Sequence, residues 1–314
     1  MEPNVDLMKK VSIITVNFNQ PLVTLELLCS ITHTNTYKNI EIIVVDNGSK
    51  TDPGPELSAQ YPNVKFIRSA TNLGFAGGNN LGIAAAGGDY FFLVNNDTEF
   101  TPGLIDNLVE VLNGHADVGV VSPRINYFAN KNIIQYAGFT GVSYYTCRNM
   151  AIGKFQRDAG QFNRVIGPTA YAHGAAMMIK RETVDKAGLM FEGYFLYFEE
   201  VDWCARISNA GYGIWMRGDA VIYHKESVSV GRKSLIKEYF MNRNRLLFMR
   251  RNAPWPARWV FYCFFLLIVA PRNMFNYIKD RNFNFISVLL KAIWWNVTHK
   301  KDSKDLGITL NTLA

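Results

Sequence analysis

The sequence predicts an α/β fold built on a mostly parallel sheet with flanking helices, and two features of the first hundred residues predict it. Short apolar runs recur along this stretch, and helical patterns separate them. A continuous apolar run of about 4–8 residues is typical of a strand that is buried on both faces. Because strands that alternate with helices pair in parallel through right-handed crossovers, this order favours a Rossmann-like sheet.

The expected elements follow one another along the whole chain. The predicted strands cover residues 11–16, 40–45, 64–67, 90–94, 118–121 and 220–223. The predicted helices cover residues 22–31, 55–60, 79–86, 101–113, 181–187 and 200–210. Residues 126–172 are rich in Tyr, Gly and Asn without clear periodicity, so they receive no assignment. Beyond residue 235 the pattern is helical, basic and aromatic.

The positive charge of the chain is concentrated at its C-terminal end. The 314 residues carry a formal net charge of +7, yet residues 232–314 contain 15 Lys and Arg against 4 Asp and Glu. Residues 1–231 contain 18 against 22. This asymmetry predicts a folded α/β domain over residues 1–231 and a basic, aromatic helical region over residues 232–314.

The N-terminal segment and the cysteines indicate an intracellular protein. Residues 1–10 are polar and lack the apolar stretch of a signal peptide, so we expect a cytosolic chain. The four cysteines are far apart, and no two of them have Cys-x-x-Cys spacing. They predict neither a disulfide framework nor a zinc site.

The end of the fourth predicted strand is the most informative segment. Apolar residues 90–94 are followed directly by Asn95, Asn96 and Asp97. Ligands of open parallel sheets bind just beyond the carboxyl ends of such strands. Oxygen ligands suit hard cations such as Mg²⁺ or Mn²⁺ rather than zinc. A turn that caps the following helix explains the same residues, so both interpretations stay open here.

Two further segments have the composition of a nucleotide pocket. Asp46 and Asn47 follow the second strand, where a carboxylate can accept a hydrogen bond from a base or a ribose hydroxyl. Residues 72–80 follow the third strand, and their glycines let backbone N–H groups approach a phosphate. The polar and glycine positions of interest are Asn72, Gly74, Gly78 and Asn79. A simple turn and an empty flexible loop are the alternatives, and the dinucleotide spacing GxGxxG is missing.

An acidic segment and a histidine complete the candidate residues. Glu199, Glu200 and Asp202 lie within four positions beside aromatic residues, at the expected start of a helix. Apolar neighbours raise the pKa of a carboxyl group toward that of a useful general base. A charged first helical turn is the alternative. His224 ends the last predicted strand, where it could complete a metal site or serve the packing.

Together these motifs resemble the family 2 glycosyltransferases, inverting enzymes of the GT-A fold that use nucleotide-diphosphate sugars. The resemblance spans about residues 11–232 and keeps the family's order of motifs. Residues 46–49 look like the nucleoside-binding segment, and residues 95–97 look like the DxD-type metal segment. Residues 199–204 look like the ED segment that holds the base. The resemblance thus implies a GT-A catalytic domain with donor-binding and acceptor-binding halves that meet near residue 100.

The resemblance also implies roles for individual residues. Residues 72–79 and 173–179 look like the rhamnosyltransferase branch, which makes dTDP-L-rhamnose the first choice of donor and UDP-hexose or UDP-N-acetylhexosamine the alternative. The implied catalytic residues are Glu200, Glu199 and Asp202, and the implied ligands of Mg²⁺ or Mn²⁺ are Asp97 and His224. The implied donor-binding residues are Asn17, Asp46, Asn47, Asn72, Gly74, Gly78, Asn79, Asn95 and Asn96. The implied acceptor contacts are Gly174, Ala175 and Trp203.

Three positions depart from the family pattern. Asn95 replaces the first Asp of the DxD motif, so Asp97 is the only carboxylate at that strand end. Glu200 stands where the family usually has Asp as base, and Phe191 stands where related sequences often carry an acid. A catalytically inactive module that binds nucleotide sugars is therefore the alternative to an enzyme.

The basic C-terminal region predicts membrane contact. Residues 259–270 form an apolar run between Arg258 and Arg272 that is shorter than the roughly 20 residues needed to span a bilayer. We expect an interfacial anchor on anionic lipid at the inner face of the cell membrane. Such an anchor suits a glycan or lipid-linked acceptor in cell-surface polysaccharide synthesis. No nucleic-acid motif accompanies the basic residues, so we expect no nucleic-acid partner.

Overall fold

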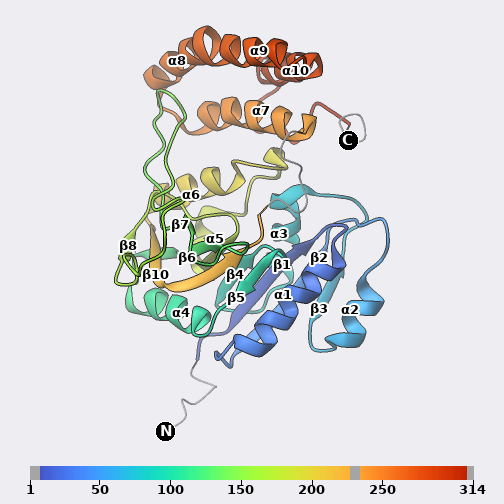
Figure 1. Ribbon diagram of the computed structural model, residues 1–314, viewed down its shortest axis with the longest axis vertical. Helices are drawn as coiled ribbons and strands as arrows, with labels where there is room; N and C mark the ends of the chain where they lie inside the picture. Colours follow the sequence, from blue (N-terminus) through green and yellow to red (C-terminus); the bar gives the residue numbers. More distant parts are fainter. Residues whose placement is uncertain (1–7, 227–233, 310–314) are drawn as a thin grey trace.

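A twisted mixed sheet forms the body of the protein, and a layer of C-terminal helices lies above it (Figure 1). The computed structural model describes residues 8–226 and 234–309. The strand order is β3-β2-β1-β4-β9-β6-β10-β5, with β7 beside β6 and β8 beside β10. The predicted boundary between residues 231 and 232 lies outside the described residues.

The strands and helices have the following bounds. The strands are β1 Val11–Asn17, β2 Ile40–Asp46, β3 Lys65–Arg68, β4 Tyr90–Val94, β5 Thr98–Phe100, β6 Val118–Tyr127, β7 Ile134–Tyr136, β8 Ile166–Pro168, β9 Ala176–Lys180 and β10 Gly213–His224. The helices of the body are α1 Pro21–Thr34, α2 Gly54–Gln60, α3 Gly74–Ala85, α4 Leu104–Gly114, α5 Arg181–Ala187, η2 Glu192–Tyr194 and α6 Glu199–Asn209. The helices of the upper layer are α7 Leu235–Asn252, α8 Trp255–Phe264, η3 Phe265–Val269, α9 Ala270–Lys279 and α10 Phe283–Thr298.

The N-terminal half has the predicted parallel arrangement. β1 pairs in parallel with β2 and with β4, and β2 pairs in parallel with β3. Each face of the sheet has its own apolar core, because strand side chains alternate between the faces. One core includes Leu28 of α1 and Leu108 of α4, and the other includes Ala76 of α3 and Trp203 of α6. The carboxyl ends of these strands therefore share one edge of the sheet.

An antiparallel strand that the sequence analysis did not assign lies in the middle of the sheet. β9 pairs with β4 on one side and with β6 on the other, antiparallel to both. All five of its side chains are buried. Because β9 runs in the opposite direction, the residues that precede it lie at the edge where β4 ends. Residues 173–175 are thereby delivered to the same edge as Asp97.

β6 and β10 are longer than their apolar patterns predict, at 10 and 12 residues instead of four each. Buried polar side chains interrupt the apolar runs and conceal the strands. Ser122 Oγ donates to Ala176 O at 2.9 Å, and Arg124 forms a 3.0 Å ion pair with Asp158. Asp158 comes from the unassigned residues 126–172, so long-range partners make these polar positions compatible with a buried strand.

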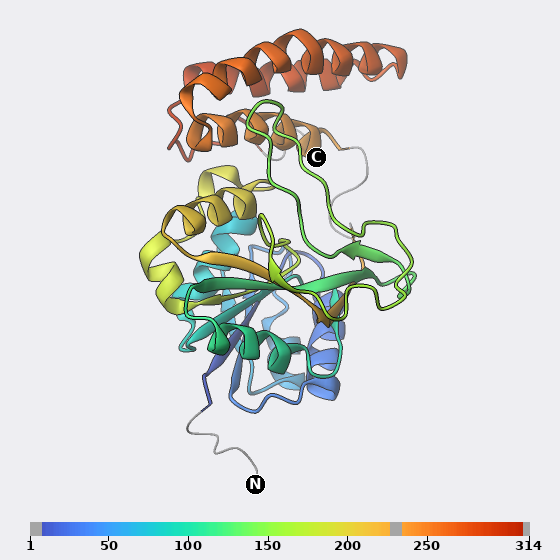
Figure 2. The ribbon, with the colours of Figure 1, turned by 90° about the vertical axis from the view of Figure 1, so that its left-hand side faces the viewer.

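The upper layer contains a helix longer than the apolar run suggests. α8, η3 and α9 continue one another, and among the described residues this helix, Trp255–Lys279, is the one that by its 25-residue length and its composition could cross a membrane. A π-helical segment precedes Pro271, whose ring cannot donate to the helical ladder. Phe261, Phe265 and Val269 are buried at four-residue spacing against α7 and α10. The helix therefore lies flat on the protein (Figure 2).

Two neighbouring tryptophans test whether the upper layer is part of the folded core. Trp295 is 2% exposed and its Nε1 donates to Asp305 O at 3.0 Å, whereas Trp294 is 66% exposed. We expect Trp295→Ala to lower the free energy of unfolding by about 3–5 kcal/mol. Trp294→Ala should change it by no more than about 0.5 kcal/mol. Urea unfolding of both variants provides the measurement, and equal midpoints would contradict an integral layer.

Candidate active site

A chain of hydrogen bonds crosses the carboxyl ends of β1, β2 and β4. Asn17 Nδ2 donates to Asp46 Oδ1 at 2.8 Å, and Asn17 Oδ1 accepts from the hydroxyl of Thr24 at 2.9 Å. Asn96 Nδ2 donates to the same hydroxyl oxygen at 3.1 Å. The first turn of α1 thus ties three strand ends together, and the predicted residues Asn17, Asp46 and Asn96 lie in one group.

Protein donors enclose the carboxylate of Asp46. The Ser49 hydroxyl donates to Oδ1, and the Ser49 backbone N–H donates to Oδ2 at 3.3 Å. Arg68 Nε lies 3.4 Å from Oδ2, and the Asp46 side chain is fully buried. Asp46 therefore holds the turn after β2 in this structure. A nucleoside that donates to this carboxylate has to replace one of these partners.

Asn47 fixes the entry into α3. Its Nδ2 donates to Asn72 Oδ1 at 3.1 Å and to Gly74 O at 3.0 Å. Gly74 has a φ of 72°, and a Cβ there would lie 2.3 Å from Phe195 O, so a side chain does not fit. Asn47, Asn72 and Gly74 therefore form one turn, which meets the loop before α6.

Gly78 and Asn79 lie within α3, which begins at Gly74 rather than at residue 79 as predicted. A Cβ at Gly78 would lie 2.9 Å from Val16 Cγ1, so this glycine lets the helix pack closely on β1. Asn79 Nδ2 donates to Phe75 O at 2.9 Å, and the side chain is buried. Helix packing accounts for both residues, and the structure does not bring them to the open edge as donor contacts.

Asp97 and His224 face each other at the ends of β4 and β10. His224 Nε2 lies 3.2 Å from Asp97 Oδ1, and both side chains are buried. His224 Nδ1 lies 2.9 Å from Gln135 Oε1. Because an amide oxygen only accepts, Nδ1 donates its proton to Gln135 and Nε2 faces Asp97. Among the described residues, Asp97 Oδ1 has no hydrogen-bond donor.

The Asp97 carboxylate and the His224 ring nitrogen, 3.2 Å apart, fit a divalent cation. A buried carboxylate oxygen without a hydrogen-bond donor is favourable only beside positive charge, which a cation held by Asp97 and His224 would supply. Carboxylate and imidazole suit Mn²⁺ as well as Mg²⁺, and Gln135 holds the ring in the tautomer that ligates metals. The described residues contain no group of three His, Cys, Asp or Glu side chains that could hold a metal ion. Phosphate oxygens or waters would have to complete the coordination.

Residues 173–175 join this pair to the acidic segment. The rings of His173 and His224 meet edge to face with centroids 6.1 Å apart, and Ala175 O accepts from Asn95 N–H at 2.9 Å. A Cβ at Gly174 would lie 3.7 Å from Glu200 Cδ. The predicted acceptor contacts Gly174 and Ala175 therefore lie between the Asp97–His224 pair and Glu200.

His173 is neutral in this position. Burial, and then the neighbouring His224, lower the pKa of His173 to about 3. His173 Nδ1 accepts from Ala175 N–H at 3.0 Å, so the proton is on Nε2. The uncharged ring adds no positive charge beside Asp97 and His224, so it would not repel a cation at this position.

Glu199 and Glu200 begin α6 and differ in their access to the site. Burial raises the pKa of Glu199 well above its ordinary value, and the charge of Glu200 raises it further. Burial also raises the pKa of Glu200, although backbone N–H groups at the start of α6 oppose the shift. Two adjacent carboxyls in such surroundings oppose each other's ionisation, so the deeply buried Glu199 is the harder of the two to ionise. Glu200 is half-buried beside Gly174 and is the acid that a ligand can reach.

Asp202 and Trp203 have structural contacts in place of the roles that the resemblance implies. Asp202 is 0% exposed and accepts four hydrogen bonds. Its donors are Tyr194 Oη, Arg206 Nε, Arg251 Nε and Asn252 Nδ2. Trp203 is also buried, and its Nε1 donates to Gly188 O at 2.7 Å. The geometry favours Asp202 as an anchor of α6 rather than a base, and Trp203 as core rather than an acceptor contact.

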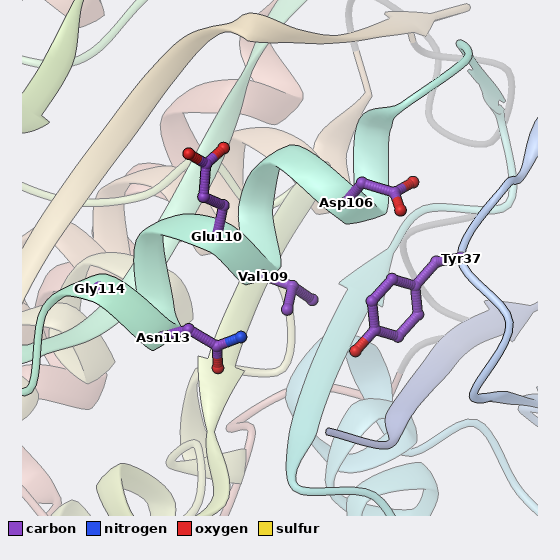
Figure 3. A pocket seen from close by; sticks show the side chains of 6 residues that line it. All are labelled: Tyr37, Asp106, Val109, Glu110, Asn113 and Gly114. Atoms are coloured by element: carbon purple, nitrogen blue, oxygen red, sulfur yellow. The ribbon is translucent and has the colours of Figure 1, made fainter. Parts of the chain in front are cut away.

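A pocket of about 480 Å³ on α4 lies at the opposite edge of the sheet (Figure 3). Its lining includes Tyr37, whose hydroxyl donates to Lys9 O just before β1. It also includes Asn113, which accepts from Tyr90, the first residue of β4. These contacts place the pocket at the amino ends of the strands, away from Asp97 and Glu200.

The sequence analysis missed three residues of this site: Thr24, Gln135 and His173. Thr24 is one polar residue in a helix, and Gln135 lies in the unassigned residues 126–172. His173 stands directly before the apolar residues of β9. Recognising those residues as a strand would have placed His173 at a sheet edge, and the resemblance of residues 173–179 to the rhamnosyltransferase branch is a second signal.

The chain is similar to proteins that assemble glycans. It is 24% identical over 250 residues to N-acetylglucosaminyl-diphospho-decaprenol L-rhamnosyltransferase of Mycobacterium tuberculosis, which covers 71% of this chain and 80% of that protein. It is 28% identical over 224 residues to the low-salt glycan biosynthesis hexosyltransferase Agl10 of Haloferax volcanii, which covers 68% and 69%.

Solved structures share the fold. The mannosyltransferase PcManGT of Pyrobaculum calidifontis, in complex with GDP-Man and Mn²⁺, superposes with a TM-score of 0.57 at 14% identity over 94% of this chain and 89% of that chain. This likeness confirms the GT-A architecture that the sequence predicts. The family model for glycosyl transferase family 2 matches residues 12–188, more than half of the chain. The protein is therefore an enzyme of glycosyl transferase family 2.

Proposed function

We propose that the protein transfers a sugar with inversion from a nucleotide-diphosphate donor, dTDP-L-rhamnose as first choice, to a hydroxyl of a lipid-linked saccharide. The observation that carries the proposal is the convergence of Asp97, His224 and Glu200 on residues 173–175 at one sheet edge. The choice of rhamnose rests on the mycobacterial relative, whose name states that donor sugar. A UDP-hexose or UDP-N-acetylhexosamine is the alternative donor.

Glu200 acts as the general base in the proposed reaction. The acceptor hydroxyl oxygen attacks the anomeric carbon while the bond from that carbon to the diphosphate oxygen breaks. The hydroxyl proton passes to Glu200, and the nucleoside diphosphate leaves with the electron pair. Asp97 and His224 would hold Mg²⁺ or Mn²⁺, which supplies positive charge beside the departing diphosphate. Glu199 is the harder of the two carboxyls to ionise, which leaves Glu200 as the one that accepts the proton.

The upper helical layer is the proposed membrane surface. Large apolar side chains are exposed along its helices, including Trp255, Trp259, Leu267, Phe275, Leu290 and Trp294, which we call the apolar face. Exposed basic residues accompany them, including Arg272, Lys279, Lys291 and Lys300. Aromatic and basic side chains on a flat helical layer suit the boundary of an anionic membrane. A membrane surface in turn suits a lipid-linked acceptor, the kind of substrate that the name of the mycobacterial relative states.

Substitution of the base tests the reaction. We expect Glu200→Gln to lower kcat about 10²–10⁴-fold, because a positioned base contributes that much. The measurement is release of nucleoside diphosphate and transfer of sugar over a panel of nucleotide sugars. The raised pKa of Glu200 also predicts that wild-type kcat falls as the pH drops through a value above the ordinary carboxyl range. Near-normal turnover by Glu200→Gln would contradict the assignment.

Metal binding is expected to depend on the nucleotide. Two protein ligands hold a divalent ion weakly, and donor phosphates would supply further oxygens. We expect Mn²⁺ to bind much more tightly in the presence of dTDP or UDP than alone, and Asp97→Asn to weaken that binding. Titration followed by the electron paramagnetic resonance of free Mn²⁺ measures both affinities. Tight binding of Mn²⁺ without any nucleotide would refute the expectation.

Vesicle binding tests the apolar face. We expect the protein to sediment with vesicles that contain phosphatidylglycerol, and less with neutral vesicles or at high salt. Leu267→Glu should weaken binding about tenfold or more, because it removes an exposed apolar contact and adds a negative charge. Leu22→Glu is the matched control, since Leu22 is 68% exposed on α1, a helix of the body. A wild-type protein that stays in the supernatant with anionic vesicles would contradict membrane association.

A further inference from the structure

Two neighbouring side chains of α7 hold the backbone of the loop that precedes Glu199. Asn244 Nδ2 lies within hydrogen-bond distance of three carbonyl oxygens of this loop. They are Tyr194 O at 2.9 Å, Leu196 O at 2.7 Å and Tyr197 O at 2.8 Å. Arg243 Nη2 donates to Gly193 O and, at 3.1 Å, to Tyr194 O. Residues 193–198 are thus attached to α7 along most of their length, and we call them the base loop.

The base loop has a backbone that needs external support. Phe195, Tyr197 and Phe198 have φ values of 65°, 68° and 74°. An aromatic residue with positive φ is strained by about 1–3 kcal/mol, and such a residue persists only where its surroundings hold it. Three of them within four positions, directly before the two glutamates, indicate that the surrounding contacts impose the conformation.

Asn244 and Arg243 can supply that support because both are rigid and fully enclosed. Each is 0% exposed, and Arg243 Nε donates to Asn244 Oδ1 at 2.8 Å. The Arg243 guanidinium also lies 4.7 Å from the Trp295 ring centroid and 4.9 Å from the Phe240 ring centroid. Among the described residues, no carboxylate lies within ion-pair distance of Arg243, so its donors are available to the backbone carbonyls.

The base loop also contacts the turn that begins α3. Phe195 O accepts from Phe75 N–H at 2.8 Å, and Gly74 leaves no room for a side chain at this crossing. The ring of Phe75 also approaches Gly174, because a Cβ at Gly174 would lie 3.8 Å from Phe75 Cζ. A displacement of the base loop would therefore move Glu200 relative to Gly174. It would also disturb the turn at Gly74 that begins α3.

A second attachment prevents α6 from moving independently of α7. Arg251 Nε and Asn252 Nδ2 of α7 donate to Asp202 Oδ1 at 3.0 Å and 2.8 Å. Asp202 lies in the first turn of α6, close to Glu200. α7 therefore contacts both the base loop, which enters α6, and the first turn of α6. The backbone of Glu200 lies between these two attachments.

We propose that Asn244, assisted by Arg243, is a positioning residue that holds the strained base loop and thereby aims Glu200 at the acceptor hydroxyl. This inference rests on the proposed function for its kinetic consequence. The structural part, which is the fixed conformation of residues 193–198, stands without it. In this proposal the C-terminal region positions the base of the active site, in addition to its proposed contact with a membrane.

The kinetic test compares two asparagines of α7. Asn244→Ala should lower kcat about 10–100-fold with a donor KM changed less than about threefold, because a small misplacement of a catalytic group costs that much in rate. The acid limb of the pH profile should move to lower pH, since a freed Glu200 gains solvent. Asn242→Ala is the control: Asn242 is also buried, but its Nδ2 donates to Glu238. Equal kinetics and an unmoved acid limb in the two variants would overturn the proposal.

Hydrogen exchange tests the base loop independently of activity. The N–H groups of Phe195 and Leu196 donate to Glu192 O and Tyr194 O, and we expect them to exchange at least about tenfold faster in Asn244→Ala than in wild type or Asn242→Ala. If Asn244→Ala does not fold, Arg243→Lys carries the test, because it keeps the charge but loses the paired donors. Unchanged exchange overturns the proposal. Failure of wild type to use any nucleotide sugar overturns the proposed function, while exchange still decides whether α7 holds the loop.

Discussion

The antiparallel pairing of β9 between β4 and β6 is the constraint on which the site depends. An all-parallel sheet would place only strand ends at the ligand-binding edge. The reversed strand adds its amino-terminal residues to that edge, and residues 173–175 there contact three different groups. His173 meets His224, Gly174 lies beside Glu200, and Ala175 accepts from Asn95 N–H. Because all five side chains of β9 are buried, the sheet core fixes the position of these contacts.

The two carboxylates at this edge differ in whether protein groups already stabilise their negative charge. Asp97 Oδ1 lies 3.2 Å from His224 Nε2 and has no hydrogen-bond donor among the described residues, and the neutral His173 provides no compensating charge. Asp46 already has hydrogen-bond donors from the protein, whereas Asp97 Oδ1 has none among the described residues. This difference favours different roles for the two carboxylates. Asp46 holds the turn after β2 in shape, whereas the proposed function assigns Asp97 to a cation and the phosphates that accompany it.

The sequence predicted the elements that follow simple periodicity and missed those held by distant partners. Buried strands β1, β2 and β4 read directly as apolar runs, and Asp46, Asp97 and His224 were proposed as site residues because they follow or end such runs. β6 was predicted too short because Ser122 and Arg124 interrupt its apolar run, and their partners lie far away in the sequence. β10 was predicted too short because Arg217, whose partners include Asn107 and Glu110, interrupts its apolar run. Gly78 was expected to face a phosphate because it lies in a glycine-rich segment after a strand. In the structure it lies within α3 and packs on Val16. Spacing predicts which residues share an edge, but only three-dimensional packing decides which of them are already occupied.

The position of α7 gives the C-terminal layer a role that composition alone does not suggest. α7 lies between the body and the helices that carry the apolar face, and its buried side chains reach in both directions (Figure 1). Arg243 contacts Trp295 of α10 and the base loop through one guanidinium. The helices proposed to meet the membrane and the loop that presents Glu200 are therefore packed against the same helix. In the proposed function, one set of contacts on α7 sets both the orientation of the membrane-facing helices and the position of Glu200.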